Sequence, residues 1–174
     1  MLIKRCSYTD FVGELTAALY GHSHPVIQKS LIETNQTVGL NLGGTIQQEI
    51  THASLICERF NLGKVRFCNS GTEANLHALA GARKFTAKSK VVVFYGAYHG
   101  AVLGFWDGVQ DNGVDKEKWL IGQYNDLECA RDLIERDDVA AVLVEGMQGA
   151  GGCISASKEF LQQIQDSARK VRKH

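Results

Sequence analysis

The stretch Arg66-Phe67-Cys68-Asn69-Ser70-Gly71-Thr72-Glu73-Ala74 decides the fold of this chain. It predicts a short strand over residues 65–68 that leads directly into a helix beginning at Gly71. Ser70 can cap that helix with its hydroxyl, and Glu73, three residues later, can complete a capping box. The free N–H groups of the first turn form an anion site together with the helix dipole, and Gly71 lets a ligand approach the backbone closely. The segment therefore predicts either a phosphate site or an ordinary capped helix without a ligand.

Length and composition predict one domain with a real core, because the chain has 174 residues of which 44% are hydrophobic and 22% charged. The net charge is zero, so no long-range field favours nucleic acid or an acidic membrane as a partner. No apolar run approaches the roughly 18 residues that would indicate a membrane span, and residues 1–6 lack the apolar core of a signal peptide. The cysteines are scattered, without a Cys-x-x-Cys pair, and predict reduced, mostly buried thiols of a cytoplasmic protein. They are Cys6, Cys57, Cys68, Cys129 and Cys153.

Apolar patterning predicts helices that alternate with strands, which indicates an α/β doubly wound architecture. The expected strands are 65–68, 91–95 and 139–144, and the last is apolar throughout, as in a parallel strand covered on both faces. Helices are expected over 25–35, over 46–60 with one buried stripe, over 71–85, after a capping box of Asn125 and Glu128, and over the final segment from Phe160 to Val171. Residues 37–45 are rich in glycine and asparagine and predict a loop.

Other candidate residues follow from their place in this pattern. Tyr98 and His99 lie in a glycine-flanked loop after the strand 91–95, where a structural hydrogen bond is the expected role of His99. Glu145 ends the strand 139–144, and ligands of open α/β sheets bind at the carboxyl ends of strands. His22 and His24 are two residues apart, whereas helical metal pairs prefer three or four. They are expected to pack or to form hydrogen bonds in the turn beside Pro25, so no metal site is predicted.

Several motifs in sequence order resemble the class-III aminotransferases. Within that family, the resemblance is strongest to the glutamate-1-semialdehyde aminomutase branch. The resemblance rests on Asn69–Ala74 followed by Tyr98-His99-Gly100, with support from Tyr8–Gly13, Gly21–Pro25, Tyr124-Asn125-Asp126 and Val144-Glu145. It implies the large domain of a fold-type I transferase that depends on pyridoxal 5'-phosphate (PLP), a three-layer α/β/α arrangement. It also implies that residues 1–45 are an N-terminal segment with an interface loop, and that 46–174 are a partial PLP-binding domain.

The resemblance assigns roles to five residues. Ser70, Gly71 and Thr72 correspond to the cradle for the PLP phosphate, Tyr98 to the aromatic residue that stacks on the pyridine ring, and Glu145 to a carboxylate near the phenolic oxygen of the cofactor. Gly146 stands where the family has proline. The family reaction is amino-group transfer or an amino shift on a small amino acid or aldehyde. Its enzymes are dimers with the site at the interface, so a homo-oligomer or a partner chain is expected.

Two catalytic groups of the family have no counterpart in this sequence. No lysine matches the Schiff-base position, so no catalytic residue is assigned, and the aspartate that pairs with the pyridinium nitrogen is absent. In the sheet of the family, three strands that come later in the sequence separate the strand 65–68 from the strand 139–144. These three strands and the C-terminal small domain are missing here, which leaves unpaired sheet edges. The lone chain is therefore expected to be inactive. Alternatives are a non-catalytic remnant, a partner subunit of a full-length paralogue, or a repurposed lyase-type, decarboxylase-type or cofactor-free enzyme.

Overall fold

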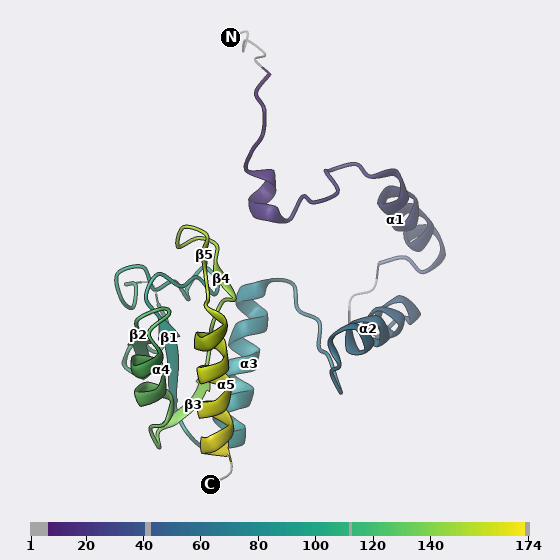
Figure 1. Cartoon of the computed structure of the whole chain (residues 1–174). Coiled ribbons are helices and arrows are strands. Elements are labelled where there is room, and N and C mark those ends of the chain that lie inside the picture. The colour runs from purple at the N-terminus through teal and green to yellow at the C-terminus, as the bar shows by residue number, and fades with distance from the viewer. Residues whose placement is uncertain (1–6, 41–42, 112, 173–174) are drawn as a thin grey trace. The chain divides into compact units, whose positions relative to one another are not determined.

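A computed structural model of the chain describes residues 7–40, 43–111 and 113–172. The chain divides into two compact units, Met1–Val65 and Arg66–His174 (Figure 1). Cys6 lies outside the described residues, as do residues 41–42 of the predicted 37–45 loop, whose described part contains no strand and contains helix only at Thr37.

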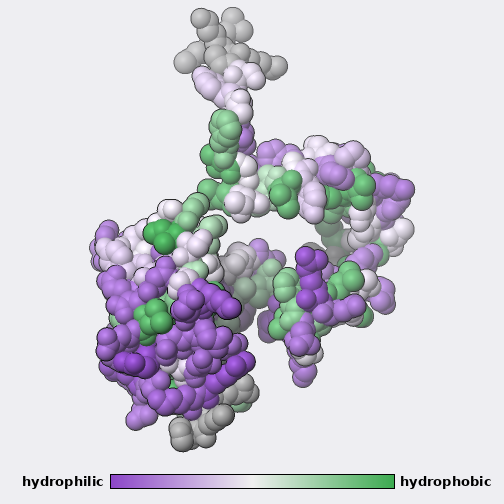
Figure 2. Space-filling model, in the orientation of Figure 1, coloured by the Kyte–Doolittle hydropathy of each residue, from purple (hydrophilic) through white to green (hydrophobic). Residues whose placement is uncertain are grey.

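The first unit holds a 3₁₀ turn, η1 (Gly13–Thr16), and two helices, α1 (Pro25–Thr37) and α2 (Gln47–Phe60). Pro25 occupies the first turn of α1, where its missing N–H costs nothing. Both predicted helices are confirmed, but the buried stripe predicted on α2 is wrong, because no residue of α2 is buried. An apolar stripe becomes buried only when another element covers it, and Phe60 is 60% exposed. Figure 2 shows hydrophobic residues at the surface of these helices.

Residues 65–68 do not form the predicted strand, since none of them belongs to a strand of the described chain. Their apolar composition suits a strand, but a strand also needs a hydrogen-bonded neighbour, and the described sheet is built from other segments. The helix that follows is confirmed as α3 (Gly71–Thr86).

The main sheet of the second unit consists of three parallel strands in the order β2-β1-β3. They are β1 (Lys90–Phe94), β2 (Trp119–Gly122) and β3 (Val139–Val142). The predicted strands 91–95 and 139–144 are confirmed, although β3 is shorter than expected, and β2 was not predicted. In the register of the sheet, Val92 lies between Leu120 and Val142. Helices α4 (Leu127–Ile134) and α5 (Lys158–Arg172) complete the unit, with a short 3₁₀ turn, η2 (Lys116–Lys118), before β2.

Alternate residues of β1 point to opposite faces of the sheet and build two cores. Val91 and Val93 pack with Leu79 of α3 and with the loop after β1, whereas Val92 and Phe94 pack against α4 and α5. Figure 1 shows α4 and α5 in front of the sheet and α3 on its other side. The arrangement is therefore a three-layer α/β/α sandwich, and β1 is fully buried from Val91 to Phe94 because helices cover both faces.

The predicted capping box of Asn125 and Glu128 is replaced by a cap on the next residue. Asp126 is the N-cap of α4, and its carboxylate accepts a hydrogen bond of 2.9 Å from the N–H of Cys129. Asn125 has a left-handed backbone, which asparagine tolerates better than most residues. Its side chain instead joins the start of α5, donating to the carbonyl of Ser155 and accepting from the N–H of Ser157.

A short antiparallel hairpin connects β3 to α5. Its strands are β4 (Met147–Gln148) and β5 (Ile154–Ser155). Gln148 is buried in this hairpin, and its amide donates a 2.8 Å hydrogen bond to the carbonyl of Tyr95. The hairpin is therefore tied to the residue that follows β1.

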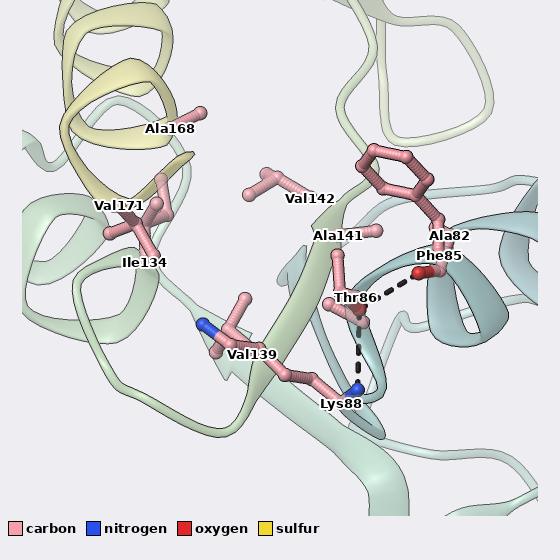
Figure 3. Close-up of a pocket in the computed structure, with 11 residues that line it drawn as sticks. Ala82, Phe85, Thr86, Lys88, Ile134, Val139, Ala141, Val142, Ala168 and Val171 are labelled. Carbon is pink, nitrogen blue, oxygen red and sulfur yellow. Dashed lines mark hydrogen bonds between the residues drawn. The ribbon is translucent and has the colours of Figure 1, made fainter. Parts of the chain in front are cut away.

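An apolar groove of about 430 Å³ runs beside β3. Figure 3 shows Val139 and Val142 of β3 at this groove, with Phe85 of α3 and Val171 of α5 on its sides. Within the described sheet β3 pairs only with β1, so its other edge is open. The sequence expectation of an unpaired edge thus agrees with the structure at β3, and an open apolar edge is prone to pair with another chain.

The described cysteines are less buried than the sequence predicts. Cys57, Cys68 and Cys129 are partly buried and Cys153 is exposed, so the expectation of mostly buried thiols is wrong for the described residues. Nowhere in the described ranges does a helix combine the length and the apolar character that a bilayer crossing requires.

Candidate functional site

The first turn of α3 is organised by reciprocal side-chain caps. The hydroxyl of Ser70, whose backbone is extended, accepts a 3.2 Å hydrogen bond from the N–H of Glu73. The Glu73 carboxylate accepts one of 2.9 Å from the N–H of Asn69, one residue before the position that a standard capping box uses. This backbone hydrogen bond is the main reason that the pKa of Glu73 lies below its usual value. The hydrogen bonds of Asn69, Ser70 and Glu73 therefore fix where α3 begins.

Two N–H groups of this turn remain for a ligand. The first four N–H groups of a helix have no intrahelical partner, and Ser70 takes up those of Glu73 and Ala74. Those of Gly71 and Thr72 have no acceptor among the described residues. A Cβ built on Gly71 would meet no atom within 4 Å, so the Cβ side of this residue is open.

Thr72 joins α3 to the loop after β1. Its hydroxyl accepts a 3.0 Å hydrogen bond from the N–H of Ala101. Gly100 lies so close that a Cβ there would be 2.4 Å from the Thr72 hydroxyl oxygen and 2.9 Å from the Thr72 Cα, and its φ is +138°. Only glycine fits this position. The close approach places the Tyr98 loop beside the start of α3.

Glu145 lies beyond the end of β3, not at its last position as predicted, and holds the same loop. One carboxylate oxygen accepts a 3.0 Å hydrogen bond from the N–H of Tyr98, and the other accepts one of 3.2 Å from the N–H of Gly149. The Glu145 carbonyl accepts from the Tyr124 hydroxyl at 2.8 Å, and burial raises the pKa of that hydroxyl, with a smaller contribution from the Glu145 charge. Gly146 is held as well, because its carbonyl accepts a 2.9 Å bond from Ala156.

The ring of Tyr98 remains accessible, with 43% of the residue exposed. Its centroid lies 5.7 Å from that of Trp106, and the ring planes are tilted by 37°. Trp106 was not predicted from the sequence. Its aromatic side chain in the glycine-rich segment after Tyr98 is the one signal that points to it.

His99 is buried beneath this loop. Its N–H donates to Leu103, and its carbonyl accepts a 2.7 Å bond from the amide of Asn75 on α3. The ring nitrogen Nε2 has no hydrogen-bond partner among the described residues, so the structural hydrogen bond expected of this ring is not found at Nε2. Burial lowers the pKa of His99, and the charge of Glu145 opposes that shift in part.

Two hydrogen bonds link the predicted site residues through the loop after β1: Glu145 accepts from the N–H of Tyr98, and Thr72, which follows Ser70 and Gly71, accepts from the N–H of Ala101. The two N-terminal histidines belong to the other unit. His22 lies 3.2 Å from a Glu14 carboxylate oxygen, and His24 contacts the ring of Tyr20, as expected for a packed turn.

Comparison with known proteins identifies the class to which this fold and site belong. The profile of the family described as aminotransferase class-III matches residues 5–172, so the chain belongs to that family. A β-phenylalanine transaminase of Variovorax paradoxus is 49% identical over 94% of this chain, and 38% of that protein is covered. Glutamate-1-semialdehyde 2,1-aminomutase of Campylobacter hominis is 31% identical over 91% of this chain and 38% of its own length.

Solved structures show the same relationship. The Variovorax paradoxus β-phenylalanine aminotransferase superimposes with a TM-score of 0.89 at 48% identity, covering 95% of this chain and 39% of that one. A transaminase solved with PLP bound gives a TM-score of 0.83 at 27% identity, covering 93% and 42%. The fold is therefore part of the PLP-dependent fold-type I transferase domain. The chain spans 36% to 44% of the length of the curated relatives reported for it.

Proposed function

We propose that this chain binds PLP through the phosphate group at the N-terminus of α3, as a class-III aminotransferase of which residues 46–174 supply part of the cofactor domain. The observation that carries the proposal is the pair of first-turn N–H groups of Gly71 and Thr72, which have no acceptor among the described residues, while a Cβ at Gly71 would meet no atom within 4 Å. Two N–H donors and a helix N-terminus suit a phosphate dianion. Residues 1–45 are then the N-terminal segment and interface loop of the subunit.

The other site residues suit the flat ring of the cofactor. The exposed ring of Tyr98 offers a stacking surface beside the phosphate donors, and Glu145 holds the backbone of Tyr98 in place. Ser70 acts mainly through the cap, because its hydroxyl already accepts from Glu73. The buried Nε2 of His99 is a polar atom in this region that still lacks a partner. When bound, PLP supplies an electron sink for bonds at the substrate carbon that bears the amino group.

The family reaction that we assign is amino-group transfer or an amino shift on a small amino acid or aldehyde. The names of the relatives indicate β-phenylalanine and glutamate-1-semialdehyde as the kinds of substrate to test first. No lysine of this chain matches the Schiff-base position. We therefore expect PLP to bind noncovalently to the 174-residue chain, without transamination above the background of free PLP.

The decisive experiment changes only the donor at the first helical position. Gly71→Pro removes one N–H where proline is favoured, and the extended backbone of Ser70 is compatible with a following proline. Gly71→Ala keeps the N–H and serves as the matched control, since the space beside Gly71 is open. Hydrogen bonds to charged groups are worth about 1.5–3 kcal/mol, so Gly71→Pro should weaken PLP binding at least about tenfold. Absorbance titration with PLP measures this, and equal affinity of the two variants would exclude the phosphate cradle.

A chemical test separates noncovalent from covalent binding. The chain is mixed with PLP, reduced with borohydride, digested and mapped. We expect no single stoichiometric pyridoxyl-lysine, and finding one would show that a lysine of this chain does take the Schiff-base role. Turnover of an amino donor by the pure chain would likewise contradict the expectation of inactivity.

A second candidate function is that of a partner subunit without catalysis of its own. The observation that favours it is the open edge of β3 beside its apolar groove, which a strand of another chain could cover. A full-length paralogue is the expected partner. Co-expression of the two chains followed by copurification tests this, with the chain alone as the reference.

A further inference from the structure

A second group of chemically reactive side chains lies on α3, beside the candidate cofactor site. Cys68 precedes the helix, while Glu73 and His77 stand one turn apart on it, at the i, i+4 spacing that places side chains on one face. One ligand atom from each of the three residues lies within 4.8 Å of the others. Glu73 Oε1 and His77 Nε2 are 3.6 Å apart.

The donor set selects the kind of ion. A thiolate, an imidazole and a carboxylate together suit Zn²⁺, which binds sulfur, nitrogen and oxygen ligands with little geometric cost. Mg²⁺ and Ca²⁺ prefer oxygen ligands alone, and Cu(I) prefers soft sulfur ligands. We propose that Cys68, Glu73 and His77 form a three-ligand site for Zn²⁺, with a fourth position left to solvent or to an external ligand.

The distances between the three ligand atoms suit a zinc ion once these atoms move slightly closer together. Zinc bonds of about 2.0–2.3 Å in a tetrahedron place ligand atoms roughly 3.3–3.8 Å apart, and the Glu73–His77 pair already lies in that range. The Cys68 sulfur has to approach by about 1.5 Å at most, given the 4.8 Å limit of the cluster. The side chains of His77 and Glu73 are 48% and 41% exposed, so rotation about their side-chain bonds can supply that movement.

The hydrogen bonds around Glu73 prepare it as a ligand. Its Oε2 atom accepts from the backbone N–H of Asn69 at 2.9 Å and from the Asn69 side chain at 3.4 Å, which leaves Oε1 turned toward His77. Outer hydrogen bonds of this kind orient metal ligands and raise affinity. When zinc binds, the thiol of Cys68 releases one proton to solvent, and no oxidant or reductant is needed.

The site does not depend on the proposed PLP function. It uses the side chains of Cys68, Glu73 and His77, whereas the phosphate cradle uses backbone N–H groups of Gly71 and Thr72. The sequence pattern raised only His22 and His24 as a possible metal pair, and the i, i+4 pair of Glu73 and His77 was not predicted. The missing signal was that Cys68 folds back onto the helix that it precedes.

Cobalt is the probe for the test. The reduced, tag-free full chain is freed of metal with a chelator and titrated with Co²⁺, because a thiolate ligand gives a charge-transfer absorption in the near ultraviolet that carboxylate and imidazole ligands do not give. We expect one equivalent of Co²⁺ with this band, which Zn²⁺ displaces. Cys68→Ser should abolish the band and lower Zn²⁺ affinity at least about 100-fold, since even outer-shell changes cost about 10–100-fold.

Matched variants identify the ligands. His77→Ala should weaken binding without abolishing the thiolate band, whereas Cys153→Ser and His22→Ala change exposed residues elsewhere and should leave affinity unchanged. Circular dichroism checks that each variant folds. Absence of the band in the parent chain, or its survival in Cys68→Ser, would overturn the proposal. Equal loss in Cys153→Ser would overturn it as well.

Discussion

Replacing Phe160 by alanine tests the core that joins α5 to the sheet. Phe160 is fully buried, and its ring packs edge to face on Phe94 at 5.0 Å and on Tyr124 at 5.3 Å between centroids. Removing a buried phenylalanine side chain costs about 3–5 kcal/mol. Because this ring lies between two aromatic partners and the cavity would be enclosed by β1 and α4, we expect a loss of about 4 kcal/mol in the free energy of unfolding.

A loss of this size is a large part of the stability of any domain. Domains unfold with a free energy of about 5–15 kcal/mol, and about 4 kcal/mol changes the unfolding equilibrium roughly a thousandfold. The assay is urea unfolding followed by far-ultraviolet circular dichroism. The transition midpoint should fall while the dependence on urea stays the same, because the surface exposed on unfolding hardly changes.

The control is Leu161→Ala on the same helix. Leu161 is 38% exposed, so its truncation should cost about 1 kcal/mol or less. Phe160→Leu should fall between the two, because leucine fills part of the volume. A loss below about 1.5 kcal/mol for Phe160→Ala, with an unchanged urea dependence, would show that α5 does not stabilise the sheet as its packing implies.

Two further predictions concern pH and association. Glu135 has a pKa below its usual value, chiefly because Lys170 donates a hydrogen bond to its carboxylate. The ionised carboxylate of Glu135 therefore stabilises the folded state at any pH above the unfolded pKa of about 4.3. This stabilisation is lost as the pH falls through the pKa that Glu135 has in the folded state, which is lower. Lys170→Met should therefore lower the urea midpoint at pH 7 but no longer at acidic pH, and an equal effect at both would contradict the assignment. The open edge of β3 and the exposed apolar residues of the first unit predict that the chain self-associates or requires a partner. Light scattering after size exclusion over a dilution series tests this, and a sharp, concentration-independent peak near 19.1 kDa would contradict it.

The sequence predicted elements well where local chemistry decides them. The cap at Ser70 fixed the start of α3, and Pro25 fixed that of α1. It failed where distant pairing decides: residues 65–68 have strand composition without a partner, and β2 is a four-residue strand that becomes one only beside β1. The cap of α4 moved from Asn125 to Asp126 because the Asn125 side chain bonds to the segment before α5, a contact that no local pattern reveals.

The sequence predicts which residues belong to the candidate site, but not the contacts that they make. Ser70 to Thr72, Tyr98 and Glu145 follow a cap or a strand end, and the carboxyl ends of parallel strands meet at one edge of a sheet. Their connections depend on tertiary packing. The carboxylate of Glu145 holds the backbone of Tyr98, and Trp106 provides the neighbouring ring. Neither contact has a signature within a single segment.

The fit of Gly100 against Thr72 has a consequence for how this protein diverges over time. A Cβ at position 100 would meet not only the hydroxyl of Thr72 but also its Cα, so no replacement at position 72 makes room for it. A descendant that gains a side chain at position 100 must lift the Tyr98 loop away from α3 and lose the arrangement that the cofactor proposal requires. Glycine at position 100 thus marks the lineages that keep this site, even where the polar residues around it have changed. Its loss in a lineage would date the point at which that lineage gave up the site.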